Sequence, residues 1–279
     1  MLSARCNFRI YCFNELLGNL RLLVAVAVLF FVVATASAAS KPSAAELAAI
    51  TERGRTLAEY DSATRQATNA VVAARAEAEP AGGYIAHKTL AGWVVDFGRL
   101  NATGDKFLVL YEATQISIPG RFEVRTFNPV REDNGWNLAA AKGIEAATRN
   151  FGRTDRPYSI AALPAGNDSL YVYLYPAEVR QGIYPFGADV RYCLSLDGAK
   201  ITEKRQLHRG VIEYAAPAGT SEKVAAGYHT HVLTNLPEDT DVMLVLTRQP
   251  RVPELVGAGA YVFAIDVDGK ISVEDQPKP

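Results

Sequence analysis

The stretch His87-Lys-Thr-Leu-Ala-Gly-Trp-Val-Val-Asp-Phe97 and the two segments after it decide the fold class. This stretch is rich in residues that favour β-strands. Asn101-Ala-Thr-Gly-Asp105 has the composition of a turn, and residues 106–112 form the next strand-like run. Pro119-Gly120 marks another turn before the alternating residues 121–127. Strands joined by such short turns predict an antiparallel meander.

The second half of the chain is also rich in strand signals. Residues 170–175 alternate Tyr with aliphatic side chains, which predicts a half-buried sheet face. The segments 194–201 and 265–271 each place Asp-Gly between strand-like runs, which is typical of a tight hairpin turn. Asp266-Val-Asp268-Gly269 resembles the start of a calcium loop but lacks the later ligands, so we expect a hairpin there. Further strand-like runs cover residues 204–214, 227–232 and 241–247.

Two segments have the apolar spacing of helices. The first runs from Ser43 to Ala74, and Ser43 and Glu46 form a capping-box pair at its start. The second begins after Asn134 and ends at Gly152. The predicted fold class is therefore α+β, with antiparallel sheet, a long N-terminal helix and one middle helix. We expect the Ala-rich helix over 43–74 to dock on the main domain; the alternative is a contact surface for a protein partner.

The first 38 residues have the pattern of a secretory signal peptide. A start that contains Arg5, Arg9 and Arg21 precedes the apolar run 22–33, and Ala36-Ser37-Ala38 fits a cleavage site. We therefore expect a secreted or periplasmic protein with no stable membrane span after cleavage. The alternative is an uncleaved N-terminal anchor. The predicted parts are the signal peptide (1–38), a linker and N-terminal helix (39–83) and a strand-rich domain (84–279), with a candidate division near 152–168.

Charge and cysteine content exclude some classes of function. The chain has 29 basic and 30 acidic residues, and this balance argues against a nucleic-acid-binding protein. About half of the residues (49%) are hydrophobic, which is typical of a globular protein. Cys6 and Cys12 lie in the predicted signal peptide, so Cys193 is alone in the mature chain and no internal disulfide is expected. We expect Cys193 to be a buried, inert thiol.

The segment Gly227-Tyr-His-Thr-His-Val232 holds the clearest chemical signal in the sequence. Alternate residues of a strand point to the same face, so His229 and His231 could bind one metal ion together. Asp241 follows closely and is a candidate third ligand. His208 becomes a further ligand if its strand lies beside that of His229. The alternative is that the two histidines make ordinary hydrogen bonds on a half-exposed strand.

His229-Thr230-His231 and the acidic residue downstream resemble the motif of the JAB/MPN metalloproteases. The resemblance implies a zinc ion bound by His229, His231 and Asp241, with Glu178 as the general base that accepts a proton from the zinc-bound water. The chain departs from this motif at two positions. Asp241 comes one residue too early, and Glu238 stands where the family has Ser.

No other catalytic motif stands out. The sequence has no G-x-S-x-G nucleophile elbow, no phosphate-binding P-loop and no G-x-G-x-x-G dinucleotide turn. We therefore expect an exported, non-catalytic binding or structural factor of the periplasm or cell envelope, without a cofactor. The alternative is a zinc-dependent hydrolase that uses His229 and His231.

Overall fold

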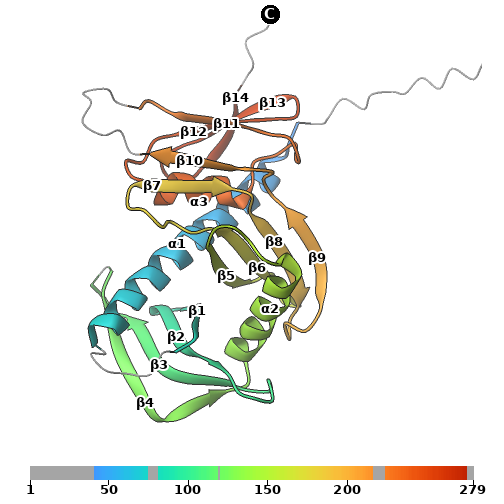
Figure 1. Cartoon of the computed structure of the whole chain (residues 1–279). Coiled ribbons are helices and arrows are strands. Elements are labelled where there is room, and N and C mark those ends of the chain that lie inside the picture. The colour runs from blue at the N-terminus through green and yellow to red at the C-terminus, as the bar shows by residue number, and fades with distance from the viewer. Residues whose placement is uncertain (1–40, 75–80, 119, 216–223, 275–279) are drawn as a thin grey trace, which may run out of the picture. The chain divides into compact units, whose positions relative to one another are not determined.

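The computed structural model describes residues 41–74, 81–118, 120–215 and 224–274, which hold three helices and fourteen strands (Figure 1). With one exception, neighbouring strands pair in antiparallel fashion. The α+β class, the long N-terminal helix and the middle helix are therefore confirmed. The predicted signal peptide lies outside the described residues. Among the described helices, none is long and apolar enough to cross a membrane.

The first sheet is the predicted meander. Its strands follow the order of the chain, β1-β2-β3-β4, and each pairs with the next in antiparallel fashion. The run 87–97, expected as one strand, is a hairpin, because Gly92 turns the chain with a φ of 133°. The bounds are β1 Gly83–Thr89, β2 Gly92–Leu100, β3 Phe107–Gln115 and β4 Phe122–Asp133.

The second sheet has the order β5-β6-β8-β9, and the middle helix α2 packs against both sheets. The alternating Tyr run lies in β6, and the Asp197-Gly198 turn joins β8 to β9 as expected. Cys193 in β8 is only partly buried, in contrast to the expectation. The bounds are α2 Trp136–Phe151, β5 Tyr158–Pro164, β6 Ser169–Pro176, β8 Val190–Ser195 and β9 Ile201–Gln206.

The C-terminal part contains a two-stranded sheet, β7-β10, and a four-stranded sheet, β11-β12-β13-β14. In the latter, β11 and β12 are parallel, and helix α3 forms the crossover between them. Asp268-Gly269 forms the β13–β14 hairpin as expected. The bounds are β7 Ile183–Gly187, β10 Val211–Ala215, β11 Gly227–His231, α3 Asp239–Thr247, β12 Glu254–Ala258, β13 Tyr261–Ile265 and β14 Ile271–Glu274.

Helix α3 replaces a predicted strand. The apolar run 242–246 is compatible with either element, because a short continuous run has no clear period. The residues before it decide the outcome. The backbone N–H of Glu238 donates to Asp241, and together they form a capping box that starts a helix at Asp239. Every residue from Asp239 to Val245 is buried, which explains why the run is apolar on all sides.

Helix α1 (Ala44–Ala74) begins with the predicted capping box: Ser43 N–H donates to Glu46 at 2.9 Å, and Glu46 N–H donates to Ser43 Oγ at 3.2 Å. Leu47 and Ile50 near its start pack in one core with α3 and the C-terminal sheet. The buried residues from Leu57 onwards join a second core with β1 to β3, β5 and β6. Its apolar face is therefore covered by the chain itself.

Candidate metal centre

Strand β11 places His229 and His231 on one face, as the alternation predicts. Burial alternates along the strand: His229 is buried, whereas Tyr228 is 62% exposed. The parallel pairing with β12 sets His229 opposite Val256 and Gly227 opposite Glu254. The two imidazoles therefore point from β11 into the interior of the C-terminal part.

Asp241 lies in the first turn of α3, and the capping box fixes its carboxylate. The oxygen Oδ2 accepts the backbone N–H of Glu238 at 2.6 Å. Oδ1 lies against the Nε2 atoms of His208 and His229, whereas Nε2 of His231 lies 3.2 Å from Oδ2. The same feature that starts the helix therefore also orients a candidate metal ligand.

His208 reaches the same point from the loop after β9. The adjacent Leu207 is buried, and its N–H donates to the backbone oxygen of Asp189 at 3.0 Å. The Asp189 carboxylate also accepts a bond from His208 Nδ1 at 2.7 Å. The backbone and the side chain of Asp189 together hold this loop in place. Nε2 of the His208 ring then points to Asp241.

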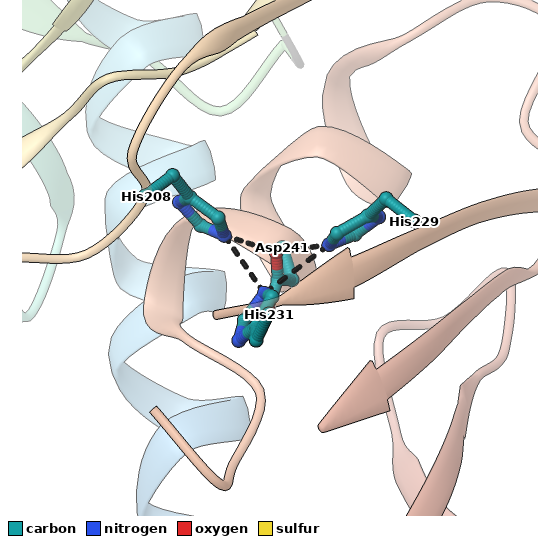
Figure 2. Close-up of side chains that lie close together, drawn as sticks. All are labelled: His208, His229, His231 and Asp241. Carbon is teal, nitrogen blue, oxygen red and sulfur yellow. Dashed lines mark hydrogen bonds and ion pairs between the residues drawn. The ribbon is translucent and has the colours of Figure 1, made fainter. Parts of the chain in front are cut away.

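The donor atoms of these four residues converge (Figure 2). Nε2 of His208 lies 2.9 Å from Nε2 of His231 and 3.0 Å from Oδ1 of Asp241. Nε2 of His229 lies 3.2 Å from His231 Nε2 and 3.1 Å from the same Oδ1. All four donor atoms lie within 4.8 Å of one another. A tetrahedral zinc ion with ligands at about 2.0–2.2 Å places its donors about 3.3–3.6 Å apart, close to these separations.

The outer nitrogen of each ring faces an acceptor that fixes its proton. Nδ1 of His208 bonds to Asp189, Nδ1 of His229 bonds to Glu254 Oε1 at 2.8 Å, and Nδ1 of His231 bonds to the backbone oxygen of Leu236 at 2.8 Å. Carbonyl oxygens and carboxylates only accept, so each Nδ1 carries the proton. All three Nε2 lone pairs then face the carboxylate of Asp241 and one another, and this arrangement needs a positive charge at its centre.

In the metal-free protein, protons supply part of that charge. Burial lowers the pKa of His208, but the carboxylates of Asp189 and Asp241 outweigh it and raise the pKa to about 10. His229 follows the same pattern: burial lowers its pKa, and Asp241 and Glu254 raise it to about 9. Burial raises the pKa of Asp241, but the histidines around it hold that pKa well below its usual range.

The cluster is closed to solvent. The four side chains are exposed by 8% (His208), 2% (His229), 1% (His231) and 0% (Asp241). Phe186 of β7 packs against two of them, with its ring centroid 4.5 Å from that of His208 and 5.0 Å from that of His229. The aromatic ring thus covers the side of the cluster between His208 and His229.

A second layer of charge surrounds the cluster. Glu254, which orients His229, also accepts from Tyr214 at 2.9 Å and pairs with Arg248 at 2.7 Å. On α3, the buried Asp239 pairs with Arg53 of α1 at 2.9 Å and with Arg191 of β8 at 2.5 Å. These bonds tie the start of α3 to α1 and to the second sheet, and the end of α3 to β12.

The structure brings together four of the five candidate residues from the sequence. His229, His231 and Asp241 meet as the motif implied, and His208 joins them. Glu178 is not in this cluster; it lies in the loop after β6, where it pairs with Arg65 at 3.4 Å. Sequence reasoning missed Asp189 and Glu254, because no local pattern marks a carboxylate that bonds to a histidine distant in sequence.

Comparisons of the chain with protein families, with characterised proteins and with solved structures find no match. The inference about function therefore depends on the geometry of the cluster.

Proposed function

We propose that this protein is an exported, non-catalytic factor of the periplasm or cell envelope whose fold is stabilised by a structural zinc ion. His208, His229, His231 and Asp241 would hold the ion. The observation that carries this proposal is the convergence of three Nε2 lone pairs and a carboxylate oxygen while acceptors hold all three Nδ1 protons. Histidines that bind metal characteristically donate their other ring N–H to a carboxylate or carbonyl.

The donor set favours zinc. Three imidazoles and one carboxylate, without thiolate, suit a borderline divalent ion, and zinc accepts four such ligands in a tetrahedron. Calcium and magnesium are disfavoured because they prefer oxygen ligands.

A structural role is favoured over hydrolysis. A catalytic zinc keeps one position free for water, whereas a structural zinc has four protein ligands. Here His208 is the fourth donor, Phe186 covers the cluster, and the side chains are at most 8% exposed. Glu178, the general base implied by the protease resemblance, is held by Arg65 instead. These observations weigh against the hydrolase alternative.

The test is metal analysis of the purified chain from residue 39 onwards by mass spectrometry. We expect about one zinc ion per chain, and loss of zinc in the double variant His229→Ala/His231→Ala. His87→Ala is the matched control, since it removes the one histidine outside the cluster. Zinc content that is unchanged in the double variant, or absent after refolding with zinc, would overturn the proposal.

The variant His208→Ala distinguishes a structural from a catalytic role of the proposed zinc ion. If His208 closes the coordination sphere, its removal should admit water and lower the thermal stability of the zinc-loaded protein. Hydrolysis of model peptides or esters by the wild-type zinc protein, lost on chelation, would instead support the hydrolase.

A further inference from the structure

A second polar site, which shares no residue with the proposed zinc cluster, lies where β1, β2, β4 and α2 surround a cavity. The cavity has a volume of about 580 Å³, which is within the range of small-molecule sites. Both tryptophans of the chain, Trp93 and Trp136, line it. Leu163 and Pro164 at the end of β5 complete the wall. The lining of the cavity therefore includes both aromatic and polar side chains.

Buried polar groups form one side of this cavity. Asp96 is 0% exposed; Asn137 Nδ2 donates to its Oδ2 at 2.6 Å, and Arg131 Nη2 donates to its Oδ1 at 2.5 Å. Asn137 is 2% exposed. Its position in the first turn of α2 brings the amide to the strands. Three elements thus contribute to a single polar network, which is costly to bury unless its groups are satisfied.

That network is incomplete within the chain. Three buried atoms of lining residues have no hydrogen-bond partner: Nδ1 of His87, Nε of Arg131 and Oδ1 of Asn137. A buried polar group without a partner costs about 1–3 kcal/mol, so buried groups are normally paired. Arg131 Nε is a donor, Asn137 Oδ1 is an acceptor and His87 Nδ1 is either, so residues of the lining carry unpaired groups of both kinds.

The formal charges of the residues that line the cavity are balanced. Arg131 and Lys88 supply two positive charges, and Asp96 and Asp133 supply two negative ones. Lys88 also pairs with Glu59 at 2.5 Å and lies 5.9 Å from the centroid of the Trp93 ring. A strongly anionic ligand would meet the two aspartates, and a cationic ligand would meet Arg131. The balance favours a neutral ligand.

From these features we infer that the cavity binds a neutral sugar unit. Sugar hydroxyls both donate and accept, so one ring can satisfy the uncommitted donors and the uncommitted amide oxygen. The C–H faces of a sugar ring pack against aromatic walls such as the indole of Trp136, which is partly exposed. This site is independent of the zinc proposal, since it shares no residue with that cluster.

The two tryptophans allow a direct test. Because both tryptophans of the chain line this cavity, tryptophan fluorescence of the chain from residue 39 onwards reports on it. We expect saturable changes with N-acetylglucosamine or glucose at Kd values of about 1 mM or below. The charged analogues glucosamine and glucuronate should bind at least about tenfold more weakly, a difference of about 1.4 kcal/mol. Isothermal titration calorimetry then gives the stoichiometry.

Two variants and a control assign any binding to the cavity. Asn137→Leu keeps the volume but removes the amide, and Thr56→Phe adds a bulky ring on the α1 side of the lining, at a residue outside the Asp96 network. Each should abolish the response, and the second decides the matter if the first fails to fold. Asn167→Leu, on the exposed β5–β6 turn, should bind like wild type. No saturable change up to about 100 mM sugar, or equal binding by Thr56→Phe, would overturn the inference, as would preferred binding of a charged analogue.

Discussion

At the scale of single residues, each imidazole of the proposed zinc cluster donates its outer N–H to an acceptor. The carboxylate of Asp189 accepts from His208, that of Glu254 accepts from His229, and the backbone oxygen of Leu236 accepts from His231. An acceptor of this kind fixes the tautomer and increases the basicity of the ligand nitrogen. The acceptors therefore matter for metal affinity although they never touch the ion.

Replacing Asp189 by Asn should weaken zinc binding by about 10- to 100-fold, because an amide holds the His208 proton less strongly. Competition with a fluorescent zinc chelator measures the change. Asp168→Asn, on the exposed β5–β6 turn, is the matched control and should bind zinc like wild type. Equal affinity in both variants would argue against a role for Asp189.

Gly227, the first residue of β11, is a second sensitive position. A Cβ there would lie 1.9 Å from Oε2 of Glu254 and 2.9 Å from Nη1 of Arg248. Gly227→Ala should therefore displace Glu254 from His229 and lower both stability and zinc affinity. Gly210→Ala, where a Cβ meets nothing within 4 Å, should change neither. Chemical denaturation with and without zinc gives both quantities.

Much of the site was predictable at this scale. The same-face pair His229 and His231 follows from strand alternation alone, and Asp241 follows from its nearness in sequence. His208 could be named only as a conditional ligand, because periodicity does not say which loop lies beside β11. Asp189 and Glu254 carry no local signal, since their partners are 19 and 25 residues away.

At the scale of elements, the crossing of α1 over α3 holds the cluster in place. Gly54 of α1 lies at the crossing, where a Cβ would come 2.5 Å from the backbone oxygen of Asp239 and 2.5 Å from Cβ of Val242. Close approach of the helices lets Arg53 reach the buried Asp239. A glycine inside a helix thus has a packing role here.

Gly54→Ala should destabilise the protein by about 1–3 kcal/mol through overpacking, although Ala favours a helix by about 1 kcal/mol over Gly. Ser62→Ala, on the exposed side of α1, should stay within about 0.5 kcal/mol of wild type. Urea unfolding measures both. A stabilised Gly54→Ala protein would show that the helices can separate at no cost.

Sequence patterns predicted most helices and strands, but they failed where an apolar run fits the periodicity of a helix and of a strand equally well. The meander, both Asp-Gly hairpins and the two long helices come from turn residues, caps and spacing. Helix α3 was misread as a strand, because Val242 to Leu246 is apolar throughout and its capping box is made by Glu238 and Asp241 rather than by Ser or Thr. The same capping box, read as a helix start, would have placed Asp241 correctly.

At the scale of the whole molecule, the cluster joins segments that are distant in the chain. His208 follows β9 of the second sheet, the histidine pair lies in β11 of the C-terminal sheet, and Asp241 lies in α3. An ion held by all three would connect two sheets and a helix. Since only the folded chain assembles the site, binding free energy adds to folding stability.

Chelation of the zinc should therefore lower the melting temperature. Zinc at about 1,000 times its Kd contributes about 4 kcal/mol, which corresponds to about 8–16 °C in a domain of this size. Differential scanning calorimetry with and without EDTA measures the shift. The double variant His229→Ala/His231→Ala should melt at one temperature in both conditions; an equal EDTA effect in that variant would point to zinc elsewhere.

The most direct test of the zinc centre is X-ray absorption spectroscopy on the zinc-loaded protein. We predict four ligands at about 2.0–2.2 Å, with outer-shell scattering that requires three imidazoles, and one imidazole fewer in His208→Ala. A spectrum with two or fewer imidazoles in the wild type, or one that is unchanged in His208→Ala, would contradict the proposed centre.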